Sequence, residues 1–248
     1  MLLARLLRCA VLPVVAWLSA GAASASDPAP RVPTVVAFGD STTAPRGPLV
    51  VYAQLLAAEL PAAGQPVRVV NAGVGGNTTD MARARFEHDV LQAHPAVVII
   101  QFGINDGVVR VWEKPTPTRS RVTLERYGEN LRYFVRTLRA QGARAILMSP
   151  NPLRWTPELV QLYGRPPYNP AEPDGFNLHL ARYAALVGQV AAEEHVPFVD
   201  VYGQFQARGG EGGRGVDALL LDGMHPNAAG HRLVADWLRP LVLSAVRD

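Results

Sequence analysis

Cysteine and lysine are almost missing from this sequence of 248 residues. Cys9 is the only cysteine, so no disulfide can form within the chain and no cysteine cluster can bind zinc. Lys114 is the only lysine, and arginine supplies nearly all of the positive charge. A protein without disulfides must obtain its stability from a packed core, and a hydrophobic content of 48% is typical of a globular chain.

Several catalytic and binding motifs are also missing. The chain has no Gly-x-Ser-x-Gly elbow, which disfavours an ordinary α/β-hydrolase. It has no His-Glu-x-x-His motif and no Gly-x-x-x-x-Gly-Lys-Ser/Thr phosphate loop. The glycines at positions 73, 75 and 76 do not have dinucleotide-binding spacing, and no nucleic-acid motif is visible. We therefore expect no metal, no nucleotide cofactor and no nucleic-acid partner.

The first 25 residues have the pattern of a signal peptide. Arg5 and Arg8 form a short positive region, residues 9–18 are apolar, and Ala23-Ser24-Ala25 is a small-x-small cleavage site. We expect cleavage after this site and export to the periplasm or the medium, with no stable membrane anchor left. An uncleaved anchor is the alternative, which the short apolar stretch and Pro13 disfavour.

The remaining residues, 26–248, are expected to form a single domain. The formal charge of the whole chain is +3, and loss of Arg5 and Arg8 leaves +1, because no acidic residue precedes Asp27. The high isoelectric point is therefore no argument for nucleic-acid binding. The sequence carries no signal for an oligomeric state.

Short apolar runs alternate with segments of helical spacing. The apolar runs predict five strands, over residues 35–38, 67–70, 97–102, 145–148 and 197–201. The helical spacing predicts helices over residues 49–60, 78–94, 124–141, 177–194 and 227–246, with an interruption of the last one at Pro240. This alternation predicts a three-layer α/β/α fold, flavodoxin-like, with a five-stranded parallel sheet.

Four short motifs carry polar residues suited to catalysis. They are Gly39–Thr42, Asn71–Thr78, Gly103–Asp106 and Asp222–His225. Three of them follow predicted strands, and the fourth precedes the last predicted helix. Because functional sites of parallel sheets lie beyond the carboxyl ends of the strands, we expect the motifs to meet there. Together they supply a serine, several N–H donors, a histidine and a carboxylate, which are the components of acyl-transfer chemistry.

The residues of these motifs suggest individual roles. Ser41 is the candidate nucleophile, although Asp-Ser-Thr alone is also common in turns. His225 is the candidate base, and Asp222, three residues earlier, lies on the same face of a helix-like turn, where it can orient the imidazole. Asp40 and Asp106 are interpreted as loop organisers. The other histidines are interpreted as solvated or helix-face residues: His88, His94, His179, His195 and His231.

In this order, the four motifs resemble the SGNH (GDSL-type) hydrolase family. The resemblance extends from about Val35 to about Leu238 and implies a serine esterase or related acyl hydrolase that needs no cofactor. It implies that Ser41, Asp222 and His225 are catalytic. The oxyanion donors it implies are the N–H groups of Ser41 and Gly76 and the side chain of Asn105, and Gly76 matches because Asn-Thr follows it.

Long predicted loops over residues 110–123 and 149–176 leave strand ends, and a third covers 206–217. The first two contain aromatic residues that either stack on sugar rings or simply pack the loops: Trp112, Trp155, Tyr163 and Tyr168. We predict an exported esterase for small acyl esters, acetyl first, on small-molecule or carbohydrate substrates. The alternatives are a short-chain carboxylesterase or lipase, a lysophospholipase or thioesterase, and a catalytically silent carbohydrate-binding protein.

Overall fold

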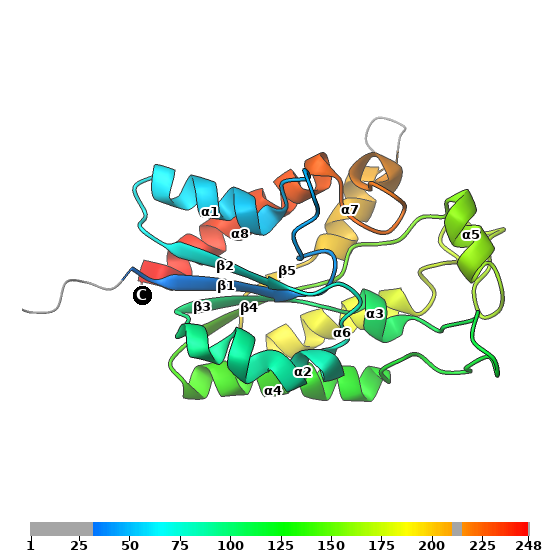
Figure 1. The fold of residues 1–248 in the computed structure, drawn as a ribbon, viewed down its shortest axis with the longest axis horizontal. Coiled ribbons are helices and arrows are strands. Elements are labelled where there is room, and N and C mark those ends of the chain that lie inside the picture. The colour runs from blue at the N-terminus through cyan, green and yellow to red at the C-terminus, as the bar shows by residue number, and fades with distance from the viewer. Residues whose placement is uncertain (1–31, 210–214, 248) are drawn as a thin grey trace, which may run out of the picture. The chain divides into compact units, whose positions relative to one another are not determined.

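Five parallel strands form the centre of the protein, in the order β2-β1-β3-β4-β5. Their bounds are β1 Thr34–Gly39, β2 Arg68–Gly73, β3 Val97–Gln101, β4 Arg144–Met148 and β5 Phe198–Val199. The computed structural model describes residues 32–209 and 215–247 (Figure 1). The predicted signal peptide, with Cys9, lies outside the described residues, and so do residues 210–214 of the third predicted loop. The observed strand order confirms the predicted flavodoxin-like α/β fold.

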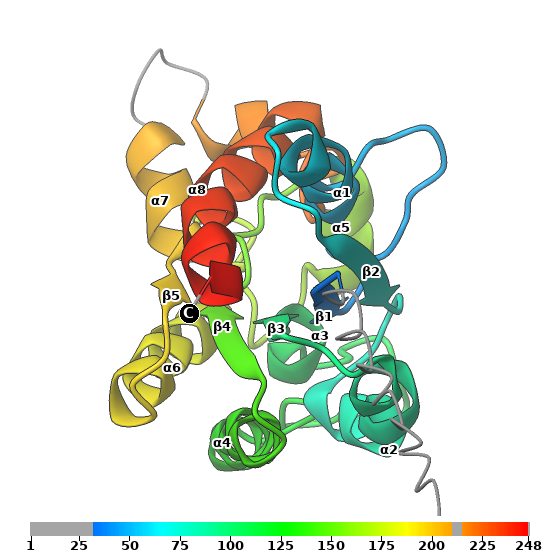
Figure 2. The same cartoon turned by 90° about the vertical axis from the view of Figure 1, so that its left-hand side faces the viewer.

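Helices cover both faces of the sheet (Figures 1 and 2). One face carries α1 (Tyr52–Ala62), α7 (Val201–Gly209) and α8 (Ala228–Arg247), and the other carries α2 (Thr79–Asp89), α4 (Leu124–Ala140) and α6 (Leu180–Glu193). Successive residues of a strand point to opposite faces. In β1, Val35 and Ala37 therefore pack with α1 and α8, whereas Val36 and Phe38 pack with α2 and α4. All four side chains are fully buried, which explains the continuous apolar run in the sequence.

The last strand is shorter than predicted because a helix begins directly after it. The sequence suggested a strand over residues 197–201, but β5 contains only Phe198 and Val199. Asp200 then accepts the backbone N–H of Gly203 at 3.0 Å, which is an N-cap interaction at the start of α7. Val201 and Phe205 of α7 are buried in the same core as α8.

The predicted interruption of the last helix at Pro240 is wrong. Helix α8 continues through this proline to Arg247. Proline removes one backbone hydrogen bond, at a cost of about 3 kcal/mol. Leu238 and Val242 on either side of it are fully buried, and their packing against the sheet outweighs that cost. No helix in the described parts of the chain is both long and apolar enough to span a bilayer.

Two short helices were not predicted: one coincides with the third motif, and the other lies in the expected loop over residues 149–176. They are α3 (Ile104–Gly107) and α5 (Pro157–Tyr163), and both lie beyond the carboxyl ends of the strands in Figure 1. A third apolar cluster packs between them, made of Ile104, Val109, Val111, Leu153, Tyr163, Tyr168, Phe176 and Leu180. Two 3₁₀ turns, η1 (Leu91–Ala93) and η2 (Val216–Leu219), complete the elements. The long loops therefore form a small core of their own next to the strand ends.

Candidate active site

The turn that carries Ser41 begins where β1 ends. The backbone N–H groups of Thr43 and Ala44 both donate to the carbonyl of Asp40, at 3.2 and 3.0 Å. A side chain on Gly39 would overlap the Thr43 hydroxyl, and one on Gly73 would overlap the backbone of Ala44. Glycine at both positions thus allows the turn after β1 to pack closely against the end of β2.

Ser41 and His225 meet although 184 positions separate them in the sequence. The His225 Nε2 atom lies 3.0 Å from Ser41 Oγ. On the other side of the ring, Nδ1 lies 2.8 Å from Asp222 Oδ2 and 3.1 Å from Asp222 Oδ1. Because Nδ1 faces a carboxylate, it carries the proton, and Nε2 is left as an acceptor for the serine hydroxyl. This arrangement is that of a nucleophile, a base and an orienting carboxylate.

The turn from Asp222 to His225 is closed by its own carboxylate. Asp222 Oδ1 accepts the backbone N–H groups of Met224 at 3.0 Å and His225 at 2.8 Å. Partial burial raises the pKa of the Asp222 carboxyl, but the hydrogen bonds from His225 and Met224 outweigh this effect and leave the pKa lowered. Asp222 therefore remains ionised at neutral pH beside the imidazole.

A segment after β4 holds this turn in place. The backbone N–H of Arg154 donates to the Gly223 carbonyl at 2.7 Å, and Asn151 Nδ2 donates to the Met224 carbonyl at 2.9 Å. Gly223 has φ of +79°, and a side chain there would lie 2.5 Å from the Arg154 carbonyl oxygen. Sequence reasoning missed this contact, because the two segments are about 70 residues apart and neither has a pattern that pairs them.

Asn105 lies in α3, next to the turn of Ser41. Its Nδ2 atom donates to Asp40 Oδ2 at 3.3 Å. Asp40 is fully buried and also accepts the backbone N–H and the hydroxyl of Thr42, each at 2.9 Å. Burial raises the pKa of the Asp40 carboxyl, although the bonds from Thr42 and Asn105 oppose this rise. Asp40 thus orients the Asn105 amide, in agreement with the interpretation of Asp40 as a loop organiser.

The glycine-rich loop after β2 also lies beside Ser41. A Cβ atom built on Gly75 would be 4.0 Å from the Cβ atom of Ser41. Gly76 has φ of +74°, and a Cβ there would meet no atom of the described residues within 4 Å. The α-carbon of Gly76 therefore faces open space, as a backbone donor for a substrate requires.

Asp106 ties this loop to α3. It is fully buried, and its Oδ1 atom accepts the backbone N–H of Thr79 at 2.8 Å and the Thr79 hydroxyl at 2.5 Å. Burial raises the pKa of Asp106 to about 7, although the bonds from Thr79 act in the opposite direction. Because Thr79 begins α2 directly after the glycine-rich loop, this contact fixes Asn105 relative to Gly76.

Arg85 of α2 braces the ends of β1 and β2. Its guanidinium donates to the carbonyls of Gly39 at 2.9 Å and Ala72 at 2.8 Å, and its Nε donates to Asn77 Oδ1 at 2.7 Å. It also pairs with Asp89 at 2.8 Å. The sequence analysis overlooked this residue. The spacing of Arg85 and Asp89, four residues apart on one helix, indicates their pairing but not the contacts with the strand ends.

His231 lies on α8, as the sequence suggested, and it also makes a contact that the sequence did not predict. Its side chain is buried, and Nδ1 accepts the backbone N–H of Tyr52 at 3.3 Å. Tyr52 is the first residue of α1, where backbone N–H groups lack a partner within the helix. Burial lowers the pKa of His231 to about 4, so the ring is neutral at physiological pH. This histidine caps a helix and faces away from the reaction.

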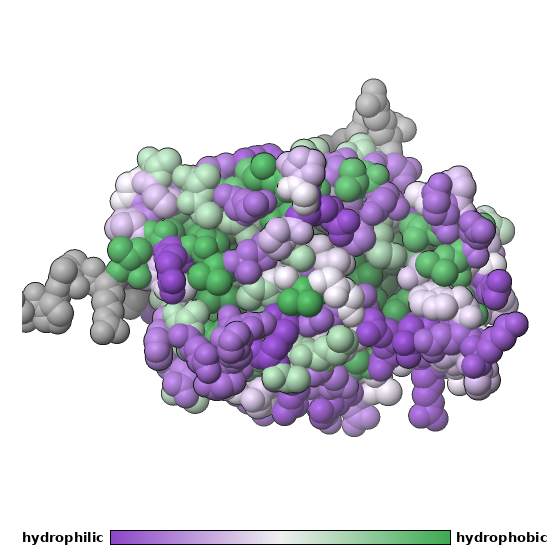
Figure 3. Space-filling model, viewed as in Figure 1, coloured by the Kyte–Doolittle hydropathy of each residue, from purple (hydrophilic) through white to green (hydrophobic). Residues whose placement is uncertain are grey.

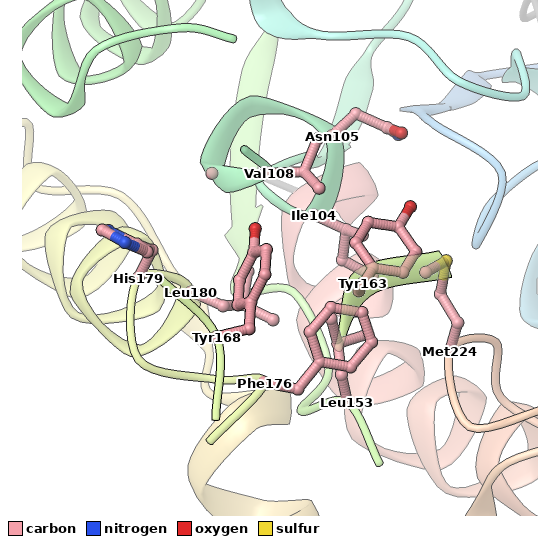
Figure 4. A pocket seen from close by; sticks show the side chains of 11 residues that line it. Ile104, Asn105, Val108, Leu153, Tyr163, Tyr168, Phe176, His179, Leu180 and Met224 are labelled. Carbon is pink, nitrogen blue, oxygen red and sulfur yellow. The ribbon is translucent and has the colours of Figure 1, made fainter. Parts of the chain in front are cut away.

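A pocket adjoins Asn105 and Met224, the residue before His225 (Figure 4). It is lined mainly by apolar and aromatic side chains, among them Ile104, Leu153, Phe176 and Leu180. Tyr163 and Tyr168 also line it. Pockets of this kind hold the apolar part of a small ligand.

The four predicted substrate-contacting aromatics divide into two pairs. Tyr163 and Tyr168 line the pocket, although both are mostly buried and also pack the loop core. Trp155 stacks on Phe176 with ring centroids 4.5 Å apart, and Trp112 contacts Tyr163 edge to face at 5.0 Å. Neither tryptophan lines the pocket.

Within residues 32–209 and 215–247, no group of three or more His, Cys, Asp or Glu side chains is placed to hold a metal ion.

Comparison with known proteins identifies the family. The family model for the GDSL-like lipase/acylhydrolase family matches residues 37–233. The chain belongs to this family. An acetylxylan esterase of Geobacillus stearothermophilus is 33% identical to this GDSL-family chain over 185 residues, which are 73% of this chain and 75% of the esterase. The uncharacterized lipoprotein YqeF of Bacillus subtilis (strain 168) is 33% identical over 227 residues, covering 83% and 87% of the two chains.

Solved structures agree with this assignment. The crystal structure of Axe2, the acetylxylan esterase from Geobacillus stearothermophilus, matches with a TM-score of 0.66 and 28% identity, over 84% of this chain and 93% of that one. A third relative found by sequence, the esterase TesA of Pseudomonas aeruginosa, is 29% identical over 216 residues. The prediction of an ester hydrolase of the SGNH/GDSL family is therefore confirmed.

Proposed function

We propose that this GDSL-family enzyme is an exported serine esterase that removes small acyl groups, acetyl first, from carbohydrate esters through an acyl-enzyme. The observation that carries the proposal is the alignment of Ser41 Oγ, the His225 imidazole and the Asp222 carboxylate, with distances of 3.0 and 2.8 Å. Asn105 and the open glycine loop lie beside this alignment.

In the proposed mechanism, Ser41 Oγ attacks the ester carbonyl carbon while His225 Nε2 takes the hydroxyl proton. Asp222 stabilises the imidazolium that forms. The oxyanion accepts hydrogen bonds from the N–H groups of Ser41 and Gly76 and from Asn105 Nδ2. His225 then gives its proton to the leaving alcohol, and the acyl group remains on Ser41. In the second half, His225 removes a proton from water, which attacks the acyl carbon; the bond to Ser41 Oγ then breaks, His225 returns the proton to Oγ, and the carboxylic acid is released.

The substrate proposal draws on similarity and on the loops. A relative named acetylxylan esterase supports an acetylated carbohydrate. The signal-peptide pattern and the similarity to a protein named a lipoprotein support export. A short-chain carboxylesterase or thioesterase is the second candidate, because the pocket next to Asn105 has mainly apolar walls.

The test compares chromogenic esters of increasing acyl length with acetylated xylo-oligosaccharides. We expect the highest kcat/KM for acetyl esters and release of acetate from the oligosaccharides, and Ser41→Ala should abolish both. Efficient hydrolysis of the chromogenic esters without release of acetate from the oligosaccharides would favour the second candidate. Full activity of the Ser41→Ala variant would contradict the mechanism.

A further inference from the structure

The segment that follows α3 concentrates positive charge near the candidate site. Residues 110–121 contain four basic residues and one acidic one: Arg110, Lys114, Arg119, Arg121 and Glu113. Their net charge is +3, whereas residues 26–248 as a whole carry +1. In Figure 3, strongly hydrophilic side chains gather on the side where Figure 1 shows the link between α3 and α4. The basic character therefore belongs to this loop and not to the domain as a whole.

Arg121 brings this charge to the site. Its Nη1 atom donates to the Gly76 carbonyl at 3.0 Å, and its Nη2 atom lies 3.6 Å from the Met81 sulfur. The same guanidinium is close enough to Tyr163 to act on the phenol: burial raises the pKa of Tyr163, and the Arg121 charge opposes the rise. Arg121 thus contacts the loop at Gly76, and its charge acts on Tyr163, which lines the pocket.

The Arg121 guanidinium makes no ion pair with any described residue, whereas Arg110 in the same loop pairs with Glu113 at 2.7 Å. Arg121 also acts on the pKa of Asp106, but that carboxylate is fully buried and accepts its hydrogen bonds from Thr79. A guanidinium has five N–H donors in a planar fork that suits carboxylates and phosphates. Only part of this capacity is used by the Gly76 carbonyl and the Met81 sulfur.

From these contacts we propose that Arg121 binds an anionic group of the substrate, so that the enzyme prefers acyl esters on negatively charged molecules. This inference rests on the proposed esterase function and specifies its substrate class. A carboxylate, as in a uronic acid of an acidic oligosaccharide, is the group that fits an exported carbohydrate esterase. Lys114 and Arg119 of the same loop raise the local concentration of such anions, whereas Arg110 is paired with Glu113.

The experiment compares matched substrates by their kcat/KM ratio. The first pair is an acetylated oligogalacturonide against an acetylated xylo-oligosaccharide of the same length. The second pair is hexanoyl glycerol phosphate against hexanoyl glycerol, which tests a phosphate as the source of charge. We expect the wild-type enzyme to prefer the anionic member of the first pair, mainly through KM, and to lose this preference as salt is added.

Arg121→Gln is expected to lower the anionic-to-neutral ratio by roughly tenfold or more, because a hydrogen bond to a charged group is lost. The ratio is unaffected by a general loss of activity, which acts on both substrates alike. Arg121→Lys keeps the charge and should retain most of the preference. Arg110→Gln is the matched control: it removes the same charge from the same loop, and it should leave the ratio largely unchanged.

Binding without turnover gives a second readout. The Ser41→Ala protein, titrated calorimetrically with an unacetylated oligogalacturonide, should bind it more tightly than a neutral xylo-oligosaccharide, and Arg121→Gln should remove the difference. An unchanged ratio in Arg121→Gln, or no anionic preference in the wild type, would overturn the inference. Preference within the phosphate pair alone would replace the uronate by a phosphate ester. If no ester is hydrolysed at all, the proposed function fails, a result distinct from hydrolysis without charge preference.

Discussion

Asn105 donates its side-chain N–H to Asp40 Oδ2 at 3.3 Å, so the residue before the candidate nucleophile orients the candidate oxyanion donor. Ser41 and Asn105 come from turns after β1 and β3, which are neighbours in the sheet. The buried carboxylate of Asp40 connects these turns, and nucleophile and donor are therefore held as one unit.

Asn105→Ala should lower kcat by roughly a hundredfold or more, because one oxyanion donor acts mainly in the transition state. KM should change little. Steady-state kinetics on a chromogenic acetate ester check this, with circular dichroism to show that the variant folds. A fully active Asn105→Ala enzyme would show that the donor is another group.

Arg85→Gln should destabilise the protein and reduce kcat. The substitution removes donors to the Gly39 and Ala72 carbonyls and leaves Asp89 with His88 as its remaining partner. We expect a loss of roughly 2–4 kcal/mol in the free energy of unfolding, measured by urea denaturation. Arg126→Gln, which breaks exposed ion pairs with Asp80 and Glu129, is the control and should cost much less than Arg85→Gln. Equal effects of the two substitutions would refute the bracing role of Arg85.

Asp106→Asn should change how stability depends on pH. The Asp106 pKa is about 7 in the folded protein against 3.8 for the unperturbed group, because burial disfavours the charge. The folded state then binds more protons than the unfolded state between these values, so this group's contribution falls as pH rises from about 4 to about 7. Asparagine is neutral at every pH, so the substitution removes this dependence of stability on pH. Urea denaturation of both proteins at pH 5 and pH 8 should show the variant gaining relative stability at the higher pH, and a constant difference would contradict the assignment.

Trp112→Ala and Trp155→Ala should behave differently. Trp112 is 38% exposed, so its loss should weaken the use of acetylated oligosaccharides more than that of a small chromogenic acetate. Trp155 stacks on Phe176 and donates to the Glu172 carbonyl at 3.1 Å. Its loss should lower the melting temperature and affect both substrates. If Trp112→Ala treats large and small substrates alike, the tryptophan only packs the loop.

The sheet was predictable because its central strands β1, β3 and β4 are almost entirely buried. Runs such as residues 97–100 are continuously apolar and stand between helical segments, and these signals are local. Helix α7 was missed because Asp200, which caps it, directly follows β5. Over so short a segment, residue propensities do not distinguish the end of a strand from the start of a helix. The interruption at Pro240 was wrong because burial of Leu238 and Val242 is a tertiary effect.

The candidate site was predictable to the extent that its motifs are short and local. Asp222 and His225 lie in one turn, and Ser41 directly follows β1. Arg85, Asn151 and the capping role of His231 depend on contacts between distant segments, for which the sequence holds no spacing signal. That Tyr163 and Tyr168 line the pocket, whereas Trp155 stacks on Phe176, likewise follows only from the folded loops.

The nucleophilic role of Ser41 is tested most directly by covalent labelling. A serine-reactive phosphonate should add one mass increment to the intact protein, and peptide mapping should place it on Ser41. Labelling should be abolished in Ser41→Ala and strongly slowed in His225→Ala, because the hydroxyl needs the base that lies 3.0 Å away. Stoichiometric labelling of a different serine, or unchanged labelling of the Ser41→Ala protein, would contradict the account.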